Sequence, residues 1–140
     1  RDRVTGILHK RGVTNTAYQQ RFFALEHGKL NYFPDEIAFA KGKTAKGTID
    51  LATHGAVPSP SVEIIKKGPK SFEFAIHTLP ALQTVKQKSF LGMRARRGAD
   101  GGGSFFLRAE TEQEMFRWIC ALDAEILRSN LLPDQGDGTE

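Results

Sequence analysis

The chain of 140 residues and 15.5 kDa is long enough for one hydrophobic core and too short for two. Its composition, 39% hydrophobic and 26% charged, is typical of a soluble globular domain, and no apolar run approaches the roughly 18 residues of a membrane-spanning helix. The net charge of +4 hides an asymmetry, because residues 1–97 hold 17 Lys and Arg against 7 Asp and Glu, whereas residues 98–140 hold 3 against 9. This dipole predicts orientation toward an anionic surface, which could be nucleic acid, an anionic membrane or an acidic protein.

Short alternating segments separated by turn residues fill the first three quarters of the chain and predict β-strands. His27-Gly28 predicts a tight turn that joins two of these strands as a hairpin. A loop at 35–46 has room for a short helical turn. We predict seven strands, at residues 4–10, 19–26, 29–33, 47–51, 55–57, 71–78 and 104–110, of which 55–57 is the weakest.

The hydrophobic period changes after the last strand. Residues 111–114, TEQE, form a capping-box pattern. Met115, Trp118, Ile119, Leu122 and Ile126 then recur at helical spacing, which predicts one amphipathic helix of about 18 residues. Strands in this order leave an open barrel or sandwich with one uncovered end, so the helix is expected to cover that end with Trp118 in the core.

Two segments stand apart from these elements. Residues 79–103 form a long basic, glycine-rich insertion between the sixth and seventh strands, and residues 131–140 form a polar tail. The single cysteine, Cys120, excludes an internal disulfide framework and suits a reducing compartment. The four histidines lack metal-ligand spacing, so we expect no metal and no cofactor. Because the chain begins at Arg1 without Met or a signal-peptide pattern, we expect a piece of a longer protein. The low cysteine content agrees with a cytoplasmic location, which we also expect.

Six segments carry a family resemblance when they are taken in order: GILHKRG, YQQRFFAL, GKLNYF, KGTIDL, SFEFAIHT and FFLRAETEQEMFRW. With them, residues 4–130 resemble a pleckstrin-homology (PH) domain, and the tryptophan of the last segment is the most recognisable mark. The resemblance implies a mainly β fold, a partly open barrel of seven antiparallel strands in two near-orthogonal sheets, capped by one C-terminal helix. It also implies that the loops after strands one, three and six meet at the open end.

The resemblance assigns candidate residues for binding lipid phosphates. The family's phosphoinositide binders have a lysine at the end of strand one, an arginine early in strand two, a tyrosine in strand three and a basic residue at the start of strand four. The matching residues here are Lys10, Arg21, Tyr32 and Lys46. Gln19 stands where the family's binders usually have a second cation. The first two loops add Arg11 and Lys43, and the insertion adds a membrane-contact set of Lys86, Lys88, Phe90, Arg94, Arg96 and Arg97.

The position of Arg21 in its strand also suggests an anion site, independently of the family resemblance. Strand parity puts Arg21 on the same side as Phe23 and Leu25, which look core-facing. A guanidinium beside a core must find an anion or carbonyl oxygens, because an unpaired buried charge is costly. A bound phosphate would serve, and so would a neighbouring carboxylate or backbone oxygens. For the insertion, a solvated loop or a basic segment that binds an acidic helix is the alternative to membrane contact.

Enzyme motifs are missing from the sequence. Gly42-Lys43-Thr44 ends like a P-loop, but Ile37 stands where the first glycine belongs. We therefore expect no enzyme but a monomeric, membrane-targeting PH domain, peripheral at a membrane, that binds anionic phospholipid, foremost phosphoinositide. The alternatives are a low-selectivity binder of lipids such as phosphatidic acid and a module that binds an acidic protein. Nucleic acid is not expected, because aromatic residues do not alternate with the basic loops.

Overall fold

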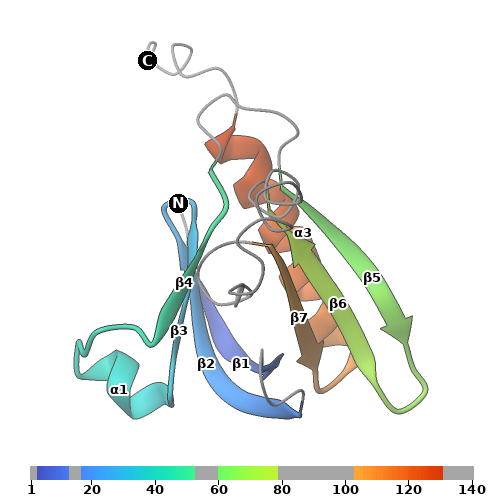
Figure 1. Cartoon of the computed structure of the whole chain (residues 1–140), viewed down its shortest axis with the longest axis horizontal. Helices are drawn as coiled ribbons and strands as arrows, with labels where there is room; N and C mark the ends of the chain where they lie inside the picture. The colour runs from blue at the N-terminus through green and yellow to red at the C-terminus, as the bar shows by residue number, and fades with distance from the viewer. Residues whose placement is uncertain (1–2, 13–16, 53–59, 79–102, 131–140) are drawn as a thin grey trace, which may run out of the picture.

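The computed structural model describes residues 3–12, 17–52, 60–78 and 103–130 (Figure 1). Its elements in chain order are β1 Val4–Arg11, β2 Tyr18–Glu26, β3 Lys29–Phe33, α1 Glu36–Ala40, β4 Gly47–Asp50, β5 Ser61–Lys67, β6 Phe72–His77, β7 Ser104–Ala109 and α3 Glu112–Ser129. The fold is mainly β with a C-terminal helix, as the sequence predicts. The described part of the chain contains no helix long and apolar enough to cross a membrane.

All seven strands belong to one antiparallel sheet with the order β4-β3-β2-β1-β7-β6-β5. The family resemblance implies two sheets, and Figure 1 shows the single sheet in two halves, with β1–β4 on one side and β5–β7 on the other. The two halves are joined where β1 pairs with β7 through His9 with Arg108 and Lys10 with Leu107. Among the described residues these two pairs bridge the halves, and through them the sheet stays continuous.

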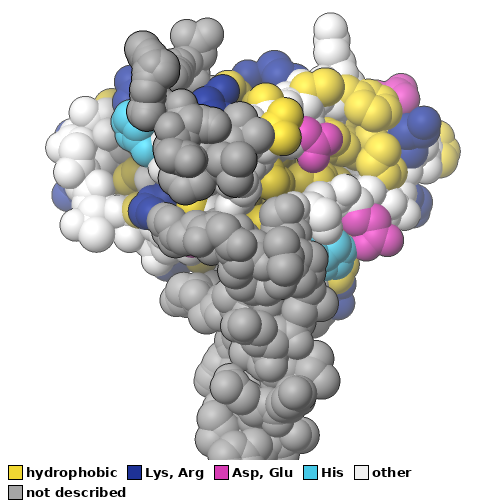
Figure 2. All heavy atoms as spheres, turned by 90° about the horizontal axis from the view of Figure 1, so that it is seen from above, with side chains coloured by type: hydrophobic (Ala, Val, Ile, Leu, Met, Phe, Trp, Pro, Cys, Tyr) yellow, Lys and Arg dark blue, Asp and Glu magenta, His cyan; other side chains and the backbone are white. Residues whose placement is uncertain are grey.

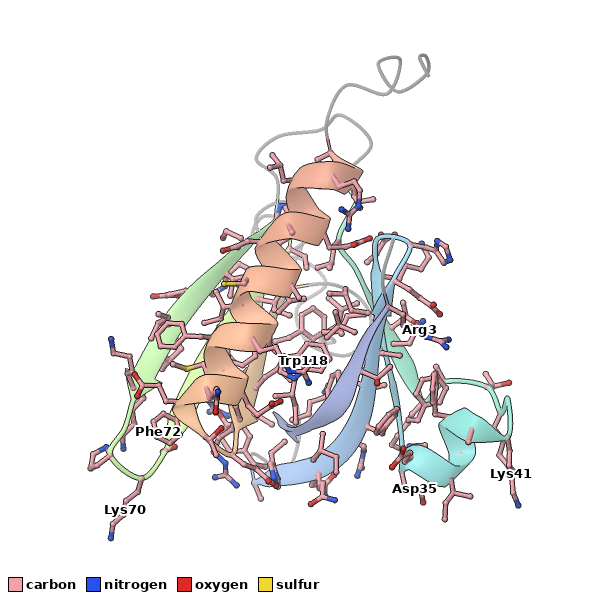
Figure 3. The ribbon with its side chains drawn as sticks, turned by 180° about the vertical axis from the view of Figure 1, so that it is seen from behind. Arg3, Asp35, Lys41, Lys70, Phe72 and Trp118 are labelled. Carbon is pink, nitrogen blue, oxygen red and sulfur yellow. The ribbon has the colours of Figure 1, made fainter. Side chains whose placement is uncertain are left out.

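The core lies between the two halves of the sheet and α3. Alternate residues of the strands face inward, among them Leu8, Phe23 and Leu107, which are fully buried. In the view from behind, α3 lies across the sheet and the labelled Trp118 points into this core (Figure 3). The Trp118 ring is fully buried and meets the ring of Phe23 edge to face at 6.4 Å. The predicted role of Trp118 as a core residue is confirmed.

The helix is also tied to the β2–β3 hairpin. His27 and Gly28 form the turn with positive φ angles of 51° and 75°, which a two-residue hairpin turn requires. The buried carboxylate of Glu125 in α3 accepts the backbone N–H of Gly28 and also pairs with Arg128. This contact fixes the last turns of the helix against the hairpin.

The fifth strand differs from the prediction. The predicted strand at 55–57 lies outside the described residues, and the sequence analysis did not assign a strand to Ser61–Lys67, where β5 lies. Polar and apolar residues do not alternate along the segment SVEIIKK. The pairing of β5 with β6 is correspondingly irregular, with a register shift between Ile64 and Lys66. Most of its residues are exposed, so the two-residue burial period that identifies a strand in sequence is lost.

Hydrophobic side chains gather on one side of the molecule when it is seen from above (Figure 2). On β5 and α3 the large exposed hydrophobic residues are Ile64, Ile65, Phe116 and Leu127. The β5 edge also carries a register shift and the exposed lysines Lys66 and Lys67. Both features discourage an edge strand from pairing with another chain. The free β5 edge is therefore protected against association with a strand of another molecule.

A second, smaller cluster lies on the outer side of β2 and β3. Phe22 and Phe33 are buried there beneath α1, whose Phe39 packs against both rings. The Asp35 side chain caps α1 by accepting the Ala38 N–H at 2.9 Å. The short helical turn that the sequence allowed at 35–46 is therefore present, and it covers apolar surface.

Candidate functional site

Three of the predicted residues come together on the core-facing side of β1, β2 and β3. Lys10 follows Leu8 at strand spacing, Arg21 precedes Phe23, and Tyr32 follows Leu30. The register places Leu8 opposite Arg21 and Phe23 opposite Tyr32, so Arg21 is the diagonal cross-strand neighbour of both Lys10 and Tyr32. Lys10 and Arg21 are half-buried, whereas Tyr32 is 8% exposed. We call Lys10, Gln19, Arg21 and Tyr32 the inner-face group.

Lys10 is held by an aromatic ring. Its Nζ lies 5.1 Å from the ring centroid of Tyr32, within the range of a cation–π interaction. The Tyr32 ring packs in turn at 5.5 Å from the ring of Phe23. An ammonium group thus sits at the border between core and solvent on a surface that attracts cations.

Arg21 binds neutral oxygens of its own strand. Its Nη1 donates to the Gln20 carbonyl oxygen at 2.8 Å, and its Nη2 donates to Gln19 Oε1 at 2.9 Å. Among the described residues Arg21 makes no ion pair. Of the partners that the sequence left open, the structure shows a backbone carbonyl together with a side-chain amide, and neither of them neutralises the charge.

Gln19 is the residue whose meaning changes most. It lies opposite Lys10 in the β1–β2 register, at the position where the family resemblance implies a second cation. Its amide oxygen accepts from Arg21 and so orients the guanidinium along the strand. With a neutral residue at position 19, the inner-face group carries one positive charge less than it would with a lysine or arginine there, and the Gln19 amide also restrains Arg21.

The loop between α1 and β4 stands next to the group. The Lys46 backbone N–H donates to the Tyr32 carbonyl oxygen at 2.7 Å, while the Lys46 side chain is exposed. The Lys43 backbone N–H donates to Ala38, and the Lys43 side chain is exposed as well. No described contact brings the Lys43 side chain to Lys10 or Arg21.

Arg11 does not join the inner-face group. The sequence analysis ended the first strand at Lys10 and grouped Arg11 with it, but β1 continues through Arg11. Because neighbouring side chains of a strand point to opposite sides, Arg11 lies on the outer face, with its guanidinium carbon 5.1 Å from the ring centroid of Phe106. This placement corrects the grouping of Lys10 with Arg11.

An outer-face cluster was missed by the sequence analysis. Arg108 lies over the ring of Tyr18 at 4.7 Å, and the Tyr18 hydroxyl donates to Glu73 at 3.3 Å. Burial, and then the charge and hydrogen bond of Glu73, raise the pKa of Tyr18 above its usual value, although Arg11 and Arg108 oppose them. These residues come from β2, β6 and β7, so no local sequence pattern links them.

The family model for the PH domain matches residues 3–127 of the chain. The chain belongs to the PH-domain family. PH domains are typically non-catalytic binding modules. Comparison with curated protein sequences gives no match.

Solved structures of other PH domains share the fold. The PH domain of human oxysterol-binding protein-related protein 11 is 22% identical, with a TM-score of 0.63 over 100% of this chain and 89% of that one. The Slm1-PH domain, in complex with inositol 4-phosphate, is 16% identical, with a TM-score of 0.58 over 87% of this chain and 94% of that one. The C-terminal PH domain of pleckstrin, in complex with D-myo-Ins(1,2,3,5,6)P5, is 22% identical, with a TM-score of 0.56 over 88% of this chain and 93% of that one.

The remaining predicted residues of this PH domain are not placed. The membrane-contact set of the insertion, Lys86, Lys88, Phe90, Arg94, Arg96 and Arg97, lies outside the described residues. Within the ranges that the structure describes, no group of three or more His, Cys, Asp or Glu residues could hold a metal ion.

Proposed function

We propose that this PH domain binds the phosphorylated headgroups of anionic membrane lipids, foremost phosphoinositides, through its inner-face group. The observation that carries the proposal is Arg21, a half-buried residue whose guanidinium has only neutral oxygens as described partners. A phosphate accepts the paired N–H groups of arginine in a bidentate geometry and supplies the missing negative charge. The inositol phosphate complexes of the Slm1-PH domain and of the pleckstrin C-terminal PH domain support this class of ligand.

The proposal gives the basic residues different roles. Lys10, Arg21 and Lys46 bind the phosphates, and Tyr32 borders the site. Arg11, Lys43 and the basic insertion add attraction to the membrane surface, where each basic residue contributes about 1 kcal/mol. The domain then acts as a monomeric, non-catalytic targeting module, peripheral at the cytoplasmic side of a membrane.

Vesicle sedimentation tests the site with a matched pair of charge deletions. Arg21→Ala is expected to weaken binding to vesicles that contain phosphatidylinositol phosphate by about 10- to 100-fold. This loss corresponds to the free energy of a charge-assisted hydrogen bond, about 1.5–3 kcal/mol. Arg11→Ala removes the same charge from the outer face and is expected to weaken binding by only about fivefold. Equal losses in the two variants would refute the inner-face site and favour general charge attraction.

A wild-type domain that binds an acidic protein but no vesicle would decide for the protein-interaction module.

Gln19 favours a version of this function with little headgroup selectivity. Gln19→Lys adds a cation to the inner-face group and removes an acceptor that restrains Arg21. We expect vesicle binding to strengthen about fivefold, because one basic residue near an anionic surface contributes about 1 kcal/mol. Gln20→Lys is the matched control, since the exposed Gln20 lies on the opposite side of β2. The measurement compares vesicles containing phosphatidic acid, a phosphatidylinositol monophosphate or a bisphosphate, and equal gains in both variants would contradict a special role of position 19.

A further inference from the structure

Gly47 lies directly under the ring of Tyr32. The two residues are partners in the β3–β4 register, and a Cβ atom added to Gly47 would lie 2.3 Å from Tyr32 Oη and 2.4 Å from Tyr32 Cζ. Real side chains do not approach so closely, so any other residue at this position would displace the ring. Gly47 is not among the described glycines with positive φ, which means that its backbone conformation does not require glycine. Room for the tyrosine ring is therefore the reason for glycine here.

The ring that Gly47 admits is held on other sides as well. Phe23 packs against it at 5.5 Å with an interplanar angle of 35°, and only 8% of Tyr32 is exposed. The Lys46 N–H donates to the Tyr32 carbonyl oxygen at 2.7 Å and ties β3 to the entry of β4. Packing against Phe23 and the absence of a side chain at residue 47 thus both contribute to the position of the ring.

The Lys10 side chain lies against this ring. Its Nζ lies 5.1 Å from the ring centroid, and the lysine is opposite Gln19 and one strand repeat from Leu8, the partner of Arg21. A lysine side chain has four rotatable bonds and loses much of its rotamer freedom when it binds a ligand. When an aromatic ring already holds the ammonium group in place, less side-chain entropy is lost on binding.

We propose that Gly47 and Tyr32 are positioning residues that hold the Lys10 ammonium group on the inner face that also carries Arg21, where it can bind the phosphate of an anionic headgroup. Neither residue has to touch the ligand in this arrangement. Tyr32 acts through the face of its ring, and Gly47 acts by letting the ring lie across β4. The inference deepens the proposed function and rests on it.

A double-mutant cycle tests whether the two residues act through Lys10. The probe is a phosphatidylcholine vesicle that contains phosphatidylinositol 4-phosphate, with affinity measured by sedimentation. Gly47→Ala and Tyr32→Leu are each expected to weaken binding about three- to fivefold, the value of a lost cation–π contact. Tyr32→Phe keeps a ring over the lysine and is expected to bind within twofold of wild type. In a Lys10→Ala background, Gly47→Ala is expected to have no further effect.

The control separates positioning from damage to β4. Thr48→Ala removes the hydrogen bond between Thr48 Oγ1 and Asn31 Oδ1 on the other face of the same strand and leaves the ring untouched. It is expected to bind vesicles like wild type even if its melting temperature falls. A similar loss of binding in Thr48→Ala, or an undiminished effect of Gly47→Ala in the Lys10→Ala background, overturns the proposal.

An NMR measurement without lipid keeps the two hypotheses distinguishable. The side-chain methylene protons of Lys10 next to the Tyr32 ring face are expected to show upfield ring-current shifts, which Tyr32→Phe retains and both Gly47→Ala and Tyr32→Leu abolish. Unshifted Lys10 signals in the wild type overturn the positioning role while leaving the proposed function standing. If the Lys10 signals are shifted but the domain binds no anionic vesicle, the ring does hold Lys10. The proposed function is then refuted, and so is the role of Gly47 and Tyr32 in phosphate binding.

Discussion

Trp118→Ala is expected to lower the free energy of unfolding by about 3–5 kcal/mol, the usual cost of deleting a large aromatic side chain from a core. Trp118 is fully buried, and its ring connects α3 to the sheet through Phe23. A domain of this size has about 5–15 kcal/mol of total stability, so the variant should be close to unfolding at physiological temperature. Chemical denaturation followed by circular dichroism measures the change.

Two companion variants sharpen this result. Among the described residues, Trp118 Nε1 is the buried side-chain polar atom without a hydrogen-bond partner. Trp118→Phe removes this unsatisfied N–H and keeps an aromatic ring, so its cost is expected to be clearly smaller than that of alanine. Leu127→Ala, at a side chain that is 64% exposed on the same helix, is expected to change stability by about 0.5 kcal/mol or less. A small effect of Trp118→Ala would contradict the view that the helix completes the core.

Glu125→Ala is expected to cost about 1.5–3 kcal/mol, because it leaves a buried donor without its charged acceptor. The carboxylate accepts the Gly28 N–H of the β2–β3 turn and pairs with Arg128, whose side chain is half exposed. Removing it weakens the attachment of the end of α3 to the hairpin, although Asn130 Nδ2 still donates to the Leu51 carbonyl oxygen. Hydrogen exchange should show faster exchange of the Gly28 amide, in addition to lower global stability.

Glu125→Gln and Asp123→Ala serve as the comparisons. Glutamine keeps an amide oxygen that can accept from Gly28, so most of the stability should remain. Asp123 is largely exposed on the same helix, and the desolvation that remains raises its pKa above the usual aspartate value, so the folded state disfavours its ionised form. Its replacement should be neutral or slightly stabilising. Equal losses for Asp123→Ala and Glu125→Ala would point to a general effect of helix charge.

The sequence predicted those parts of the fold that depend on local periodicity. The alternation around Phe23 and Leu25 predicts a half-buried strand, and the spacing of Met115, Trp118 and Leu122 predicts the helix, both of which the structure contains. β5 escaped prediction because an irregular, exposed edge strand has no such period. The same reasoning explains why Arg21 was placed correctly beside the core, since parity within one strand is a local property.

The candidate site shows where this reasoning ends. Strand parity identified the face of Arg21, but only the folded chain shows that its partners are Gln19 and the Gln20 carbonyl group. The family resemblance selected Tyr32, yet its place over Gly47 and under Lys10 depends on the β3–β4 register. One extra residue of strand at the end of β1 was enough to move Arg11 to the other side of the sheet.

The sequence by itself determined the mainly β architecture, the covering helix, the charge asymmetry and the inward direction of Arg21. All of these follow from periods and composition that are read along the chain. Only the tertiary structure decided which side chains meet: Tyr18 with Glu73, Lys10 with Tyr32, and Glu125 with Gly28. Such contacts join residues far apart in sequence, and they depend on strand register and helix docking, which the packing of the whole core selects.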